Sequence, residues 1–142
     1  SLSQAVSVSD ISEARRRHLG QKYGVAVMSD NRQAANRGDA VVLAIKPQNL
    51  VEVMAELNGQ LKPVQLVLSI VAGARIDTLC RGLNHHCVVR AMPNTPAQIG
   101  EGITVWTATP EVTEQQKGWA GSILGAACFI TMVTSGKLAE VI

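Results

Sequence analysis

Two short runs of the sequence combine polar side chains with proline at places where a strand is predicted to end. Lys46-Pro47-Gln48 follows the apolar residues 40–45, and Pro93-Asn94-Thr95-Pro96 follows residues 87–92. A cation between a buried strand and a proline has little use in packing. Two prolines stiffen a loop, which holds the asparagine amide and the threonine hydroxyl at a fixed place. Both runs are therefore typical of ligand-binding loops.

Small or polar residues also follow the other predicted strands. Ser9 and Asp10 follow the first strand, Asn31 lies just after the second, and Ala72 and Gly73 follow the fourth. Ligands of open α/β sheets bind beyond the carboxyl ends of the strands, so we expect these residues to share one binding edge. Local structure explains several of them equally well, because serine, aspartate and asparagine often cap helices and a turn glycine often needs a positive φ.

The patterns of hydrolytic and phosphate-cradling sites do not occur in the sequence. It has no G-x-S-x-G elbow, no P-loop and no paired catalytic carboxylates. The adjacent His85, His86 and Cys87 have the wrong spacing for a zinc site, and no metal is expected. A ligand edge without acid–base machinery fits cofactor chemistry, in which the protein binds, orients and polarises the reactants.

Length and composition indicate one domain with an ordinary core, since the chain has 142 residues of which 46% are hydrophobic. The formal charge of +2 indicates neither a nucleic-acid surface nor a polybasic membrane surface. No apolar run is long enough to span a bilayer. Three cysteines without a C-x-x-C spacing indicate a reducing compartment, and we expect a cytoplasmic protein.

The hydrophobic pattern alternates between β-like runs and runs of helical period, which is typical of an α/β domain. The run Ala40–Ile45 is apolar throughout, as expected for a strand covered on both faces. Strands are predicted at residues 5–8, 25–28, 40–45, 66–71, 87–92, 103–107 and 128–133, with helices between most of them. This order predicts a doubly wound, mostly parallel sheet with helices on both faces.

Capping signals set the expected helix boundaries. Asp10 and Glu13 are expected to form a capping box before a helix that places Ile11, Ala14, His18 and Leu19 on one side and ends at Gly24. Asp30 or Asn31 is expected to cap a brief helix. Asn49 and Glu52 are expected to form a second box, before a helix that Pro63 ends, and Thr113 with Gln116 is expected to cap the last helix.

Several strings of the sequence resemble the pyrroline-5-carboxylate reductase family. Val41-Val42-Leu43-Ala44-Ile45-Lys46-Pro47-Gln48 resembles its V-x-L-A-V-K-P-Q segment, and Ser69-Ile70-Val71-Ala72-Gly73 resembles its S-I-x-A-G turn. Arg90-Ala91-Met92-Pro93-Asn94-Thr95-Pro96 resembles the R-x-M-P-N-T-P motif and is followed by Gly100-Glu101-Gly102. The likeness covers nearly the whole chain in order, and the last motif is highly specific.

The resemblance implies a Rossmann-like domain of an oxidoreductase of proline biosynthesis, which reduces 1-pyrroline-5-carboxylate to L-proline with NADPH, NADH remaining possible. It implies that Ser9, Asp10 and Asn31 lie beside the adenosine of the cofactor. Lys46, Pro47, Gln48, Ala72 and Gly73 would line the ribose and nicotinamide side. Asn94 and Thr95 would lie near the nicotinamide, where the imine substrate approaches.

The two ends of the chain depart from the family pattern. The family begins with a strand and a Gly-rich G-x-G-x-M turn, which would hold the cofactor pyrophosphate, and this chain has neither. The absent strand is central in the usual order, so its loss would leave an edge or a gap in the sheet. The family's C-terminal helical domain, which builds a homo-oligomer, is also absent. Residues 1–142 are therefore expected to be the NAD(P)-binding fragment of a larger enzyme.

Two other interpretations stay open. The first is a truncated α/β module that binds a nucleotide or a partner without turnover. The second is a dehydrogenase of related architecture that acts on a different small substrate.

Overall fold

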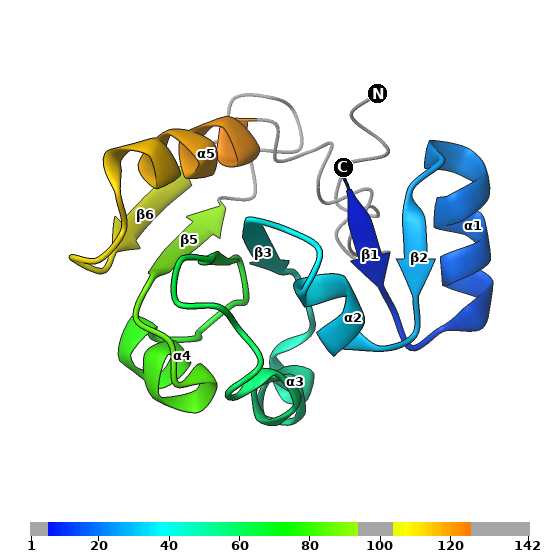
Figure 1. The fold of residues 1–142 in the computed structure, drawn as a ribbon, viewed down its shortest axis with the longest axis horizontal. Coiled ribbons are helices and arrows are strands. Elements are labelled where there is room, and N and C mark those ends of the chain that lie inside the picture. The colour runs from blue at the N-terminus through cyan, green and yellow to red at the C-terminus, as the bar shows by residue number, and fades with distance from the viewer. Residues whose placement is uncertain (1–5, 94–103, 126–142) are drawn as a thin grey trace.

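The computed structural model describes residues 6–93 and 104–125 (Figure 1). Strands and helices alternate through most of this chain, as predicted. In order they are β1 (Ser7–Ser9), α1 (Glu13–Tyr23), β2 (Ala26–Met28), α2 (Asn31–Ala35), β3 (Ala40–Leu43), a 3-10 turn (Pro47–Asn49), α3 (Leu50–Leu57), β4 (Leu66–Ser69), α4 (Ile76–Leu83), β5 (Val88–Pro93), β6 (Thr104–Ala108) and α5 (Glu114–Gly125). The strand expected at 128–133 lies outside the described residues.

The described strands pair in two separate sheets. β1 pairs with β2 in parallel, and the other sheet has the order β3-β4-β5-β6. In that sheet β3, β4 and β5 run parallel, and β6 is antiparallel to β5. The predicted α/β architecture with mostly parallel strands is confirmed. The expected gap in the sheet is present as well, because no hydrogen-bonded pairing joins β1 to β3 within residues 6–93 and 104–125.

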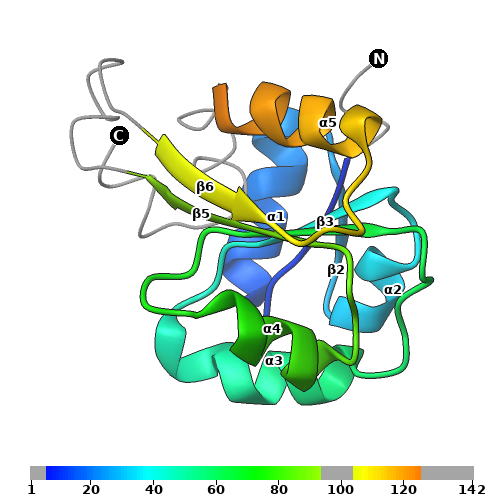
Figure 2. The same ribbon diagram turned by 90° about the vertical axis from the view of Figure 1, so that its left-hand side faces the viewer.

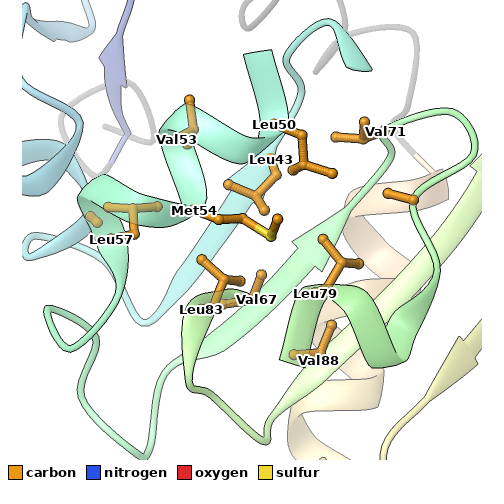
Figure 3. Packing of buried hydrophobic residues seen from close by; sticks show 12 residues of the cluster. Leu43, Leu50, Val53, Met54, Leu57, Val67, Val71, Leu79, Leu83 and Val88 are labelled. Carbon is orange, nitrogen blue, oxygen red and sulfur yellow. The ribbon is translucent and has the colours of Figure 1, made fainter. Parts of the chain in front are cut away.

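Helices cover both faces of the larger sheet, with α3 and α4 on one side and α5 on the other (Figure 2). The first core packs Leu57, Leu79 and Leu83 against Val67 and Val88 of the strands (Figure 3). A second core lies between the sheet and α5, and it is lined by Leu66, Leu68, Val89, Ala91, Ala120 and Leu124. The apolar strand β3 contributes to both cores, which confirms the prediction of two covered faces. No described helix is long and apolar enough to cross a bilayer.

The start of α1 differs from the prediction. The helix is capped by Ser12, whose hydroxyl accepts the backbone N–H of Arg15 at 3.2 Å. Asp10 lies two residues before Ser12, and its carboxylate accepts the backbone N–H of Ser12 at 2.8 Å. Ile11 therefore precedes the helix and is 87% exposed, whereas Leu19 is fully buried. Ala14 and His18 are also exposed, so the predicted apolar side was wrong except at Leu19.

The boundaries of α3 were also predicted wrongly. Asn49 makes no side-chain capping bond, because the 3-10 turn at Pro47–Asn49 leads directly into the helix. The helix ends at Leu57 rather than near Pro63, since Gly59 turns the chain with a φ of 78°. Leu61 still packs against the first core after this turn, so apolar residues keep the helical spacing beyond the end of α3.

Other helix ends agree with the sequence. Gly24 ends α1 in the left-handed region with a φ of 67°, and Asp30 caps α2 by accepting the N–H of Arg32. At α5 the Thr113 hydroxyl accepts the N–H of Gln116, whose side chain accepts the N–H of Thr113 in return. This pair is the predicted capping box.

Candidate functional site

The parallel strands bring two of the predicted segments to one edge. β3 and β4 are in register at Leu43 and Ser69, so the residues that follow them leave the sheet side by side. Lys46, Pro47 and Gln48 are exposed beyond β3, and Ala72 and Gly73 are exposed beyond β4. Ligands of open α/β sheets commonly bind at this edge, and it is called the binding edge below.

Gly73 has a backbone conformation that favours glycine. Its φ is 75°, and a methyl group added there would meet no atom within 4 Å. The open space and the left-handed turn fit a place where a ligand approaches the backbone closely. Next to the turn, the buried Ser69 hydroxyl accepts the N–H of Val71 at 3.3 Å, which fixes the start of the turn.

The end of β1 and the start of α2 meet through side chains. The Ser9 hydroxyl donates to Oδ1 of Asn31 at 2.6 Å, and Nδ2 of Asn31 donates to Oε2 of Glu56 on α3 at 3.0 Å. The backbone N–H of Asp10 donates to the carbonyl of Met28 at 3.2 Å, which joins the ends of β1 and β2. Ser9, Asp10 and Asn31 thus lie together, as the sequence predicted.

Two arginines of α1 surround Asp10. Nε of Arg15 lies 3.6 Å from Oδ2 of Asp10, and Nη1 of Arg16 donates to the Asp10 carbonyl at 2.7 Å. Nε of Arg15 is buried and has no hydrogen-bond partner in the described part of the chain. Two guanidinium groups thus lie beside Asp10 at this corner, and guanidinium groups pair well with phosphate.

A cavity of about 110 Å³ lies between β1 and β3. Its lining comes from β1, α2, β3 and α3 and includes Ser9 and Asn31 at the binding edge. Val41, Val42 and Leu43 line it from β3. The cavity occupies the place where the two sheets lack a connecting strand.

The sequence did not single out two residues at this edge. Glu56 lies 25 residues from Asn31 in the chain, so no local pattern indicates their contact. Arg90 is the first residue of the R-x-M-P-N-T-P motif. It lies opposite Ser69 and Thr107 in the sheet, and its buried Nε has no hydrogen-bond partner within the described residues.

Asn94 and Thr95, the predicted catalytic residues, lie outside the described residues. His85 and Cys87 lie just before β5, at the end of the sheet opposite the binding edge. The His85 ring is bonded to the Gln65 carbonyl at 2.6 Å, and the Cys87 thiol donates to Gln116 at 3.1 Å. Both side chains are buried and have a structural role there.

Comparison with protein families matches residues 3–73 to the family described as NADP oxidoreductase, coenzyme F420-dependent. The chain belongs to this family. The match runs from before β1 to the Ala72-Gly73 turn after β4, so it includes every predicted cofactor residue. The chain is thus a member of an NADP-dependent oxidoreductase family.

Curated relatives confirm the resemblance to pyrroline-5-carboxylate reductases. The chain is 42% identical to the enzyme of that name from Synechocystis over 80% of its own length, and 39% identical to that from Vibrio alginolyticus over 89%. It spans 42% and 48% of the length of these two relatives, which is about half.

Solved structures agree with this assignment. The pyrroline-5-carboxylate reductase from Coxiella burnetii matches 96% of this chain and 56% of its own, with a TM-score of 0.81 and 30% identity. The pyrroline carboxylate reductase from Plasmodium falciparum, solved with NADP bound, has the same fold at a TM-score of 0.66 and 20% identity, and the match covers 96% of this chain and 64% of that one.

Proposed function

We propose that this chain is the cofactor-binding part of an NADPH-dependent reductase that converts 1-pyrroline-5-carboxylate to L-proline. When bound, NADPH would supply a hydride to the carbon of the substrate C=N bond, and the substrate nitrogen would take up a proton from solvent. Two observations support this most, in a chain up to 42% identical to reductases of this name: Ser9 contacts Asn31 after β1, and the segments that follow β3 and β4 lie side by side.

The cofactor would extend along that edge. Ser9, Asp10 and Asn31 would hold the adenosine ribose. Residues 46–48, together with Ala72 and Gly73, would line the other ribose and the nicotinamide. Gly73 supports this arrangement because its turn leaves open space above the backbone.

The two arginines of α1 that lie beside Asp10 favour NADPH over NADH. Asp10 alone would favour NADH, because a carboxylate accepts from a free 2′-hydroxyl and repels a phosphate. Nε of Arg15 lies 3.6 Å from this carboxylate, so its positive charge offsets the repulsion of a phosphate. The family description, which names NADP, points the same way.

We propose that the full-length protein also contains a further strand and a helical domain. A strand with a Gly-rich turn would lie between β1 and β3, where its backbone would pair with both open edges and fill the cavity. A further helical domain would complete the substrate site and form a homo-oligomer. The substrate is a small molecule, and we propose that the enzyme works in the cytoplasm without nucleic-acid or membrane partners.

Titration of the full-length protein with NADPH, followed by an assay with 1-pyrroline-5-carboxylate, tests this function. We expect micromolar NADPH binding, and oxidation of NADPH that depends on the imine. Lys46→Ala should weaken NADPH binding about tenfold, whereas the exposed Lys62→Ala should not. NADPH binding without turnover would favour the alternative of a non-catalytic nucleotide-binding module, and an absence of binding would overturn the proposal.

Asn94 and Thr95 are proposed to contact the reacting groups. Asn94→Ala in the full-length enzyme should lower kcat at least tenfold, because the amide would no longer orient the imine against the nicotinamide. Its melting temperature should stay within a few degrees of wild type. Unchanged kinetics would remove Asn94 from the site.

A further inference from the structure

Glu56 lies behind the binding edge and is in none of the quoted motifs. It projects from α3, is half-buried, and accepts a hydrogen bond from Nδ2 of Asn31 at 3.0 Å. Asn31 in turn accepts the Ser9 hydroxyl at 2.6 Å. One chain of side-chain hydrogen bonds thus connects β1, α2 and α3 and ends at the edge of the sheet. In the fold, α2 packs against both β1 and α3 (Figure 1).

The chemistry of the carboxylate fixes the direction of these bonds. An ionised glutamate can only accept, so the atom of Asn31 that faces Glu56 must be the amide nitrogen. The amide oxygen then faces Ser9, and the serine must donate its only proton to it. The orientation of Asn31, which is otherwise ambiguous for an amide, follows from the charge of Glu56.

This direction decides what the edge offers to a ligand. With its proton committed to Asn31, the Ser9 oxygen has only lone pairs left, and it accepts from a ligand hydroxyl. Asn31 retains one N–H and one lone pair. The pair therefore suits a ribose, whose hydroxyl groups donate, and leaves a phosphate to the guanidinium groups near Asp10.

We propose that Glu56 is a positioning residue for cofactor binding, which acts through Asn31 to make Ser9 an acceptor for a ribose hydroxyl. The inference depends on the proposed function, since it assumes a ribose at this edge. Glu56 touches Asn31 and is not itself a ligand of the cofactor in this proposal.

Substitution of Glu56 in the full-length protein tests the proposal by NADPH titration and steady-state kinetics. Glu56→Ala should raise the dissociation constant and the KM for NADPH about five- to tenfold, with kcat at saturating NADPH within twofold of wild type. Glu56→Gln should restore most of the affinity, because its amide oxygen still accepts from Asn31. Glu52→Ala is the matched control, since Glu52 is exposed one turn earlier on the same helix.

A double-mutant cycle separates a positioning role from a general structural one. If Glu56 acts through Asn31, Glu56→Ala should have no added effect on NADPH affinity in an Asn31→Ala background. Additive effects would overturn the proposal, and so would an unchanged affinity of Glu56→Ala alone. Failure of the wild-type protein to bind NADPH would instead overturn the proposed function, and this inference with it.

Discussion

The buried side chain of Gln116 forms hydrogen bonds with three different segments of the fold. Its amide oxygen accepts the N–H of Thr113 at 2.9 Å and the thiol of Cys87 at 3.1 Å. Its amide nitrogen donates to the carbonyl of Val64 at 2.9 Å. With 6% of its surface exposed, Gln116 joins the start of α5 to the segment before β4 and to the start of β5.

Gln116→Ala should destabilise the protein by about 2–3 kcal/mol, because it leaves several polar groups without partners in a buried place. Urea denaturation monitored by circular dichroism measures this change. The neighbouring Gln115 is exposed, and Gln115→Ala should change the free energy of unfolding by less than about 0.5 kcal/mol. Equal effects of the two substitutions would contradict the structural role of Gln116.

Cys87 is expected to be chemically inert in the folded protein. Burial raises the pKa of its thiol, and the Glu111 carboxylate raises it further, although the hydrogen bond to Gln116 acts in the opposite direction. Thiolate is the reactive form, so iodoacetamide at pH 7.5 should leave Cys87 largely unmodified until denaturant is added. Peptide mass spectrometry measures the labelling, and rapid modification of Cys87 in the folded protein would contradict the prediction.

At the scale of elements, α1 depends on a small core of its own. Leu19 is fully buried and packs with Val8 of β1 and with Val25, which directly precedes β2. This cluster is separate from the two cores of the larger sheet. The position of Ser9 and Asp10 at the binding edge therefore depends on few apolar contacts.

Leu19→Ala should cost about 2–4 kcal/mol of stability and should also weaken NADPH binding, because it loosens the unit that carries Ser9 and Asp10. Leu83→Ala removes an equally buried leucine from the first core and should cost a similar amount. It should leave NADPH affinity nearly unchanged in the fully folded protein. Thermal denaturation and NADPH titration of both variants make the comparison, and equal losses of affinity would contradict a special role for α1.

The cap of α2 predicts a dependence of stability on pH. The backbone N–H and side chain of Arg32 hold the pKa of Asp30 below its ordinary value of 3.8. This contribution to stability is complete above pH 3.8 and is lost as the pH falls through the lowered pKa. Asp30→Asn retains a capping oxygen without the charge, so its melting temperature should fall less between pH 5 and about pH 2.5. A parallel decline of both proteins would contradict the assignment.

The sequence was informative where a feature is local or repeats along the chain. The apolar run at Ala40–Ile45, the Thr113–Gln116 box and Gly24 were all predicted from their neighbours, and the structure confirms them. Ile11 was placed on the buried side of a helix because the cap was expected at Asp10, two residues before the observed cap at Ser12. The contact of Glu56 with Asn31 could not be predicted, since tertiary packing alone brings α3 next to α2.

At the scale of the whole molecule, the open edges of β1 and β3 distinguish this chain from a continuous sheet. If a further strand fills this place in the full-length protein, backbone amides of β3 that face the gap should exchange with deuterium more slowly there than in the isolated 142 residues. Amides of β4 serve as the control, since β4 is paired on both sides. Equal exchange of β3 in both proteins would contradict the proposed strand.

The division into two sheets also bears on how cooperatively the chain unfolds. Among the described residues, the β1–β2 pair shares no backbone ladder with the larger sheet, and α2 packs against both this pair and the first core. We therefore expect each sheet to open as a separate foldon, the smaller one at the lower local free energy. Heating the isolated chain should therefore melt the end of the site that carries Ser9, Asp10 and Arg15 before the end that carries Lys46 and Gly73.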